Sequence, residues 1–92
     1  MEISKERLEK YFKITKEAFE LAKNSDNRTE MLEQRADIMD MVERYIKDAE
    51  HFYSEGRIVD AFACLNYAHG WLDCGARLGI FDVHDSRLFT VD

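Results

Sequence analysis

Apolar side chains recur along most of this chain at intervals of three and four residues, which places them on one face of an α-helix. Three such stretches are predicted, over residues 4–24, 28–54 and 57–78, with short polar turns between them. Helices joined by short turns lie antiparallel, and no proline interrupts any of the three stretches. The pattern predicts an all-α, antiparallel up-and-down three-helix bundle formed by a single domain of residues 1–92.

The third stretch is apolar around most of its circumference. One stripe on this helix comprises Ile58, Ala61, Leu65, Ala68, Leu72 and Ala76, and an adjoining stripe comprises Cys64, Tyr67, Trp71, Cys74 and Leu78. A helix that is hydrophobic nearly all round is normally a buried one. We therefore expect residues 57–78 to lie in the middle of the bundle, covered by the other two helices.

The helix ends carry recognisable signals. Ser4 suits the N-cap of the first helix, and Asn27, with Glu30 three residues later, suits that of the second. Gly56 and Gly79 suit the left-handed position that follows a helix. The tail, residues 79–92, contains six apolar residues, Ile80, Phe81, Val83, Leu88, Phe89 and Val91. Because so much exposed apolar surface is unfavourable, the tail is expected to fold back over the bundle or to swap onto a partner.

Charge and composition narrow the classes of function. The net charge is −6, from 13 basic and 19 acidic residues, which argues against nucleic acid as a partner. No run approaches the roughly 20 apolar residues that span a membrane, and the first ten residues lack the apolar centre of a secretory leader. On one helix, Cys64 and Cys74 lie about 15 Å apart, too far for a disulfide. We expect reduced cysteines and a cytoplasmic location.

One narrow polar strip runs along the third helix. Asn66, Asp73 and Arg77 fall within about 40° of arc, with His69 and Gly70 beside them. These five residues form a candidate interaction surface for a ligand or a protein. The alternative is a solvated face with a weak Asp73–Arg77 ion pair. Since a glycine inside a helix costs about 1 kcal/mol relative to alanine, Gly70 suggests the close approach of a ligand, the tail or another helix.

The sequence contains little that indicates chemistry. His69 and Asp73 lie one turn apart, but a metal site needs a third and a fourth ligand, so no metal, cofactor or catalytic residue is assigned. The spacing of Arg77 and His84 resembles the signature of the HEPN superfamily of helical-bundle ribonucleases and nucleotide-binding domains. That resemblance implies an RNA-cleaving site with His84 as general base. The acidic charge of the chain argues against RNA.

The block YAHGWLDCGARLGIF, residues 67–81, followed by Leu88-Phe89-Thr90, resembles an archaeal family called domain of unknown function 357. The preceding GRIVDAFACL, residues 56–65, agrees with it. The resemblance implies a cytoplasmic three-helix up-and-down bundle and supplies no activity, substrate or catalytic residue.

Two functions follow from these observations. The first is a small non-enzymatic helical interaction or assembly protein, whose partner is an unidentified protein or a second copy of the chain. The alternative is a nucleotide- or RNA-acting helical-bundle enzyme that uses Arg77 and His84, with His69 and Asp73 nearby. Convergence of these side chains on one pocket would favour the enzyme.

Overall fold

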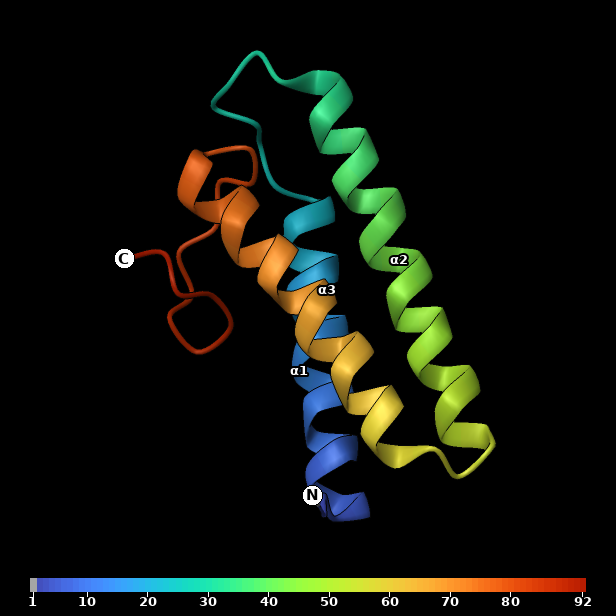
Figure 1. The fold of residues 1–92 in the computed structure, drawn as a ribbon. Coiled ribbons are helices and arrows are strands. Elements are labelled where there is room, and N and C mark those ends of the chain that lie inside the picture. Colours follow the sequence, from blue (N-terminus) through green and yellow to red (C-terminus); the bar gives the residue numbers. More distant parts are fainter. Residues whose placement is uncertain (1) are drawn as a thin grey trace.

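Three antiparallel helices form the body of the molecule, in a computed structural model that describes residues 2–92. They are α1 (Lys5–Lys23), α2 (Leu32–Ser54) and α3 (Ile58–Leu78). The chain runs up α1, down α2 and up α3, and the tail then descends beside α3 (Figure 1). The helix α3 packs against both others, which contact each other least. The predicted all-α three-helix bundle with a central third helix is confirmed. None of these helices is long and apolar enough to cross a membrane.

Three of the predicted helix-end signals act as expected. The Ser4 hydroxyl accepts a hydrogen bond from the Arg7 backbone N–H at 3.1 Å and caps α1. Gly56 and Gly79 have φ values of +77° and +81°, which glycine adopts without strain. After α3, the Ile80 N–H donates to the Gly75 carbonyl at 2.9 Å, which is the long hydrogen bond of a Schellman motif.

The start of α2 differs from the prediction. The helix begins at Leu32 rather than at residue 28, and its N-cap, Met31, makes no side-chain capping bond. The Asn27 side chain instead accepts hydrogen bonds from the N–H and the hydroxyl of Thr29, at 2.9 and 2.6 Å. The prediction of Asn27 as N-cap is therefore wrong, because this side chain builds a local turn of the type that competes with a helix start.

The residues before α2 are held by the tail. The Arg28 N–H donates to the Gly79 carbonyl, and the Asp82 N–H donates to the Asp26 carbonyl, both at 2.9 Å. These two backbone hydrogen bonds join the α1–α2 loop to the segment that follows α3. The loop therefore satisfies part of its backbone through the tail rather than by continuing the helix.

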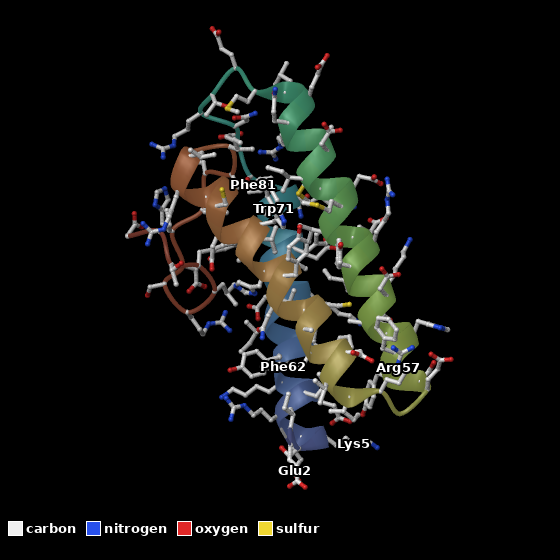
Figure 2. The ribbon with its side chains drawn as sticks, viewed as in Figure 1. Glu2, Lys5, Arg57, Phe62, Trp71 and Phe81 are labelled. Atoms are coloured by element: carbon white, nitrogen blue, oxygen red, sulfur yellow. The ribbon has the colours of Figure 1, made fainter. Side chains whose placement is uncertain are left out.

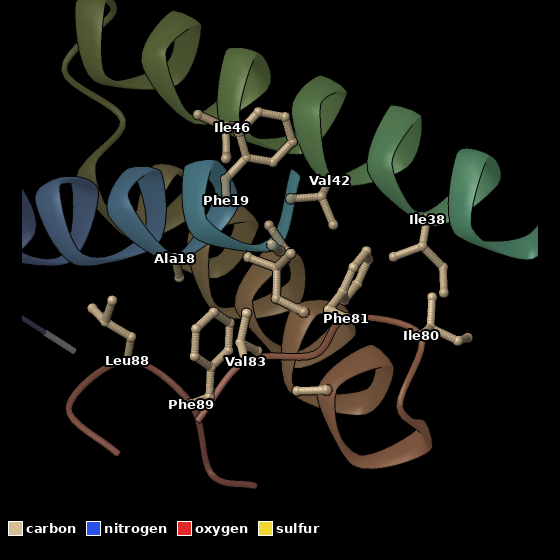
Figure 3. Close-up of a cluster of buried hydrophobic side chains, with 14 residues drawn as sticks. Ala18, Phe19, Ile38, Val42, Ile46, Ile80, Phe81, Val83, Leu88 and Phe89 are labelled. Carbon is tan, nitrogen blue, oxygen red and sulfur yellow. The ribbon is translucent and has the colours of Figure 1, made fainter. Parts of the chain in front are cut away.

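The tail packs onto its own bundle and completes the core. Near the amino end of α1 a smaller cluster is built from helical side chains alone, namely Leu8, Phe12, Ala49, Ala61 and Leu65. The half-buried Phe62 of α3 packs against this cluster (Figure 2). The larger cluster, at the other end, includes five buried tail residues, Ile80, Phe81, Val83, Leu88 and Phe89 (Figure 3). Of the two predicted fates of the tail, the structure shows the fold-back.

Phe81 is the tail residue that lies deepest against α3. Its ring is fully buried and covers Gly75, where an added Cβ atom would overlap the ring. Figure 3 shows Phe81 and Ile80 pointing from the tail toward Ile38 and Val42 of α2. Gly75 is thus required for packing, since any side chain there would displace the ring.

The expectation that α3 is buried nearly all round is wrong for its second stripe. Tyr67 and Leu78 are 48% and 55% exposed, and Cys74 is exposed as well. The first stripe is buried as expected, apart from a half-buried Ile58. In a three-helix bundle each helix has two neighbours and one outer side, and here the tail covers only part of that outer side of α3 (Figure 1).

Arg35 of α2 ties the ends of the other two helices together. Its guanidinium donates to the carbonyls of Ser25 and Ile80, both at 2.6 Å, and to that of Ala22 at 3.2 Å. It also lies 5.2 Å from the centre of the Phe81 ring. A cation is favourable here because the last carbonyls of a helix carry partial negative charge. One side chain therefore joins the end of α1, the following loop and the start of the tail.

Arg35→Ala is expected to lower the free energy of unfolding by about 2–4 kcal/mol, because several carbonyls lose a charged donor at once. Arg44→Ala is the matched control. Within residues 2–92 Arg44 pairs with Asp40 on the exposed side of α2, so its loss is expected to leave the free energy of unfolding nearly unchanged. Urea denaturation measures both variants. Equal losses would contradict the role assigned to Arg35.

Two glycines of α3 give a second matched pair. Gly75→Ala is expected to lower the free energy of unfolding by about 1–3 kcal/mol, because the new methyl group overlaps the Phe81 ring. Gly70→Ala is expected to raise it by about 0.5–1 kcal/mol in dilute solution, because nothing lies within 4 Å of its methyl position. Thermal unfolding followed by circular dichroism checks both signs. Destabilisation by both substitutions would show that Gly70 has a hidden packing role.

Candidate functional site

Four of the five residues of the predicted polar strip, Asn66, His69, Gly70 and Asp73, line one groove beside the tail, and Arg77 lies outside it. His69 and Asp73 are half-buried and contact the tail, whereas Asn66, Gly70 and Arg77 remain exposed. The predicted Asp73–Arg77 ion pair does not form, since no such contact within 4 Å occurs in the part of the chain that the structure describes. The tail divides the strip into a structural half and an open half.

His69 joins α1, α3 and the tail through both of its ring nitrogens. Nε2 lies 2.5 Å from the Leu88 carbonyl oxygen, and Nδ1 lies 3.1 Å from the hydroxyl of Thr15, a residue only 1% exposed. Because a carbonyl oxygen can only accept, Nε2 carries the proton and donates it. In the neutral ring, Nδ1 then accepts from the Thr15 hydroxyl. His69 thus satisfies a buried hydroxyl group and a tail carbonyl.

Two further contacts hold the same part of the tail. The Asp73 carboxylate accepts a hydrogen bond from the Thr90 N–H at 3.0 Å. Arg87 donates to both carboxylate oxygens of Glu17 on α1, at 2.6 and 3.2 Å. The hydrogen bond from Arg87 is the main cause that holds the pKa of Glu17 below its usual value. These contacts therefore tie the tail to both α1 and α3.

A groove of about 370 Å³ runs along this seam between α1, α3 and the tail. His69, Asp73 and Arg87 line it, and each already has a protein partner. A general base needs a free nitrogen or oxygen within reach of a substrate proton. In this groove both ring nitrogens of His69 are engaged, and Oδ1 of Asp73 accepts a hydrogen bond from the tail.

Arg77 and His84 do not form the pair that the ribonuclease alternative needs. Among the described residues no hydrogen bond joins them, and both hydrogen bonds of the His84 ring go to carboxylates. His84 lies on the surface between two carboxylates, with Nε2 at 2.8 Å from Asp82 and Nδ1 at 2.8 Å from Asp92. The hydrogen bonds to Asp82 and Asp92 raise the pKa of His84. Since a carboxylate accepts hydrogen bonds, the protonated His84 ring donates to both Asp82 and Asp92, so both ring nitrogens have a partner within the chain.

The other reactive side chains are isolated. Within residues 2–92, no group of three or more His, Cys, Asp or Glu side chains is placed to hold a metal ion. Both cysteines are free thiols. Burial is the main cause that raises the pKa of the Cys64 thiol, which makes its thiolate, the reactive form, harder to reach.

The feature that the sequence analysis missed is the open side of α3. Six exposed residues share this side, and together they are called the outer face: Val59, Ala63, Tyr67, Gly70, Cys74 and Leu78. All six are uncharged. Asn66 and Arg77 border them, whereas the exposed sides of α1 and α2 carry charges such as Glu6, Lys13, Glu43 and Lys47. A solvent-facing helix side of this length without a charged residue in its centre is unusual for a surface helix.

The middle of the outer face is a shallow, open depression lined by aromatic rings. A depression of about 390 Å³ is bounded by Asn66, Tyr67, Gly70, Trp71 and Cys74. The Tyr67 ring packs against that of Tyr45 on α2, with centroids 4.7 Å apart, and edge-on against Trp71 at 6.3 Å. Rigid aromatic rings beside an open glycine resemble the anchor positions of protein interfaces. The signal was present in the sequence as the second apolar stripe, which was assigned to the core.

Comparison with known proteins supports the resemblance found in the sequence. Residues 10–81, most of the chain, match the family described as "Protein of unknown function (DUF357)". No curated protein and no solved structure matches the chain. The matched span contains Arg35, Gly75, Phe81 and the outer face of α3, and it ends before the tail residues that contact His69 and Asp73.

The raised pKa of His84 gives a prediction about pH. The Asp82–His84–Asp92 contact stabilises the docked tail fully below the unfolded-state pKa of histidine, and this stabilisation is lost as the pH rises through the folded-state pKa. Asp82→Asn is expected to lower the pKa of His84 toward its ordinary value, and Asp85→Asn, which does not contact His84, is the control. Titration of the His84 ring signals by NMR measures this. An unchanged pKa in Asp82→Asn would contradict the assigned cause.

Proposed function

This chain belongs to the DUF357 family of proteins of unknown function, and we infer that it is a non-enzymatic interaction protein whose binding surface is the outer face of α3. The observation that carries this inference is an exposed, uncharged helix side with a shallow depression at its centre, bounded by Tyr67, Gly70 and Trp71. Aromatic anchors in such a setting supply most of the binding energy at protein interfaces.

Two further observations support a protein as the partner. The net charge of −6 opposes binding to the phosphate backbone of a nucleic acid. The polar groups that could have served catalysis, His69, Asp73 and His84, are occupied by partners within the chain. The two free thiols support a reducing compartment, and we propose the cytoplasm.

Site-specific photo-crosslinking tests this function. Replacing Tyr67 with p-benzoylphenylalanine keeps an aromatic ring on the outer face, and the same replacement at exposed Lys13 of α1 is the control. After irradiation in cells of the source organism, we expect a discrete covalent adduct from position 67 and none from position 13. Gly70→Lys, which adds a charge where nothing lies within 4 Å, should abolish the adduct without unfolding the protein. The absence of an adduct at position 67, or the same adducts at both positions, would contradict the proposal.

A further inference from the structure

We propose that the partner of the outer face is a second copy of this chain, with the two α3 helices packed antiparallel around a two-fold axis. This inference rests on the proposed function and names the partner of the same surface. Closed two-fold dimers are the commonest form of self-association, and their interface must be complementary to itself. The outer face meets that condition.

Self-complementarity follows from the order of the six residues. We place the two-fold axis between Ala68 and His69 of each copy. In this antiparallel pair, a residue a given number of positions before the axis faces the residue of the second copy that lies the same number of positions after it. The pairs that result are Val59 with Leu78, Ala63 with Cys74, and Tyr67 with Gly70. Each pair occurs twice by symmetry, which gives six layers. Every one of the six residues therefore has a partner on the second copy.

The chemistry of each layer is favourable. In the outer layers the aliphatic side chains of Val59 and Leu78 face each other. In the next layers the small side chains of Ala63 and Cys74 face each other. In the central layers, the half-exposed Tyr67 ring meets Gly70, beside which the depression is open and nothing lies within 4 Å of a would-be Cβ atom. Large residues opposite small ones allow two helices to pack closely without clashes.

The spacing of the outer face also suits two rigid helices. The intervals between its residues are four, four, three, four and four, so the pattern repeats after eleven residues. An eleven-residue repeat has about 3.67 residues per turn and drifts only about 20° along a straight α-helix. The stripe therefore stays on one side of α3 for roughly 29 Å. This matters because α1, α2 and the tail hold α3 in place and prevent it from coiling around a partner.

Electrostatics favours this face over the others. Each copy carries a net charge of −6, so two copies repel each other on average. The outer face has no acidic residue among its six members, whereas the exposed side of α2 displays residues such as Asp37 and Glu43. Two copies therefore meet with the least like-charge contact through α3.

Disulfide trapping tests the register. In a Cys64→Ala background, Ala63→Cys is expected to form disulfides with Cys74 of the second copy under mild oxidation, giving a dimer. Within one chain these two positions lie about 16 Å apart, so an internal bridge cannot form. The control variant carries Ala63→Cys with both native cysteines replaced, and it should not cross-link, because two copies of position 63 are also about 16 Å apart in the pair. Equal cross-linking of both variants would overturn the register.

Sedimentation velocity of the unmodified chain tests the dimer without cross-linking. We expect a shift from monomer to dimer between low micromolar and near-millimolar concentration. Gly70→Lys and Leu78→Lys should each raise the dissociation constant by at least about tenfold while leaving the circular dichroism unchanged. A strict monomer throughout, together with no disulfide between positions 63 and 74, overturns the self-association. If position 67 then still captures a different protein in cells, the proposed function stands alone. If it captures nothing, both fail.

Discussion

The contact between Arg35 and the ends of the other two helices is the constraint on which the rest of the structure depends. The guanidinium donates to carbonyls from the end of α1, the following loop and Ile80. By holding Ile80, Arg35 sets where the tail leaves α3 and keeps the Phe81 ring over Gly75. The larger half of the core then closes around tail side chains. Arg35 also satisfies carbonyls that α1 leaves unpaired at its end.

The path of the tail decides what the polar residues of α3 can do. Because the tail descends on the α1 side of α3, His69 and Asp73 become its anchors. Residues of the types that often serve in catalysis are here engaged in holding a chain terminus. The same path leaves the part of α3 that faces away from α1 uncovered. The path of the tail is therefore the cause both of the anchoring role of His69 and Asp73 and of the exposure of Asn66, Gly70 and Arg77.

The surface of the bundle is divided by chemistry. The helices α1 and α2 present charged side chains to solvent, while α3 presents the uncharged outer face. The helix α3 contacts both other helices and still has an open side, because two neighbouring helices do not surround it.

The sequence by itself determined the three helices, their antiparallel order, the capping by Ser4, Gly56 and Gly79, and an apolar tail that either its own bundle or a partner must cover. These depend on periodicity and on local backbone chemistry, which act within a few residues of one another. Only the tertiary structure decided that the tail covers its own bundle, that Asn27 builds a turn, that Arg35 joins two helix ends, and that His69 and Asp73 hold the tail. It also decided that one apolar stripe of α3 is buried and the other is open. Both stripes have the same helical periodicity. Which stripe is covered depends on where segments distant in the sequence lie, and a local pattern of residues does not contain that information.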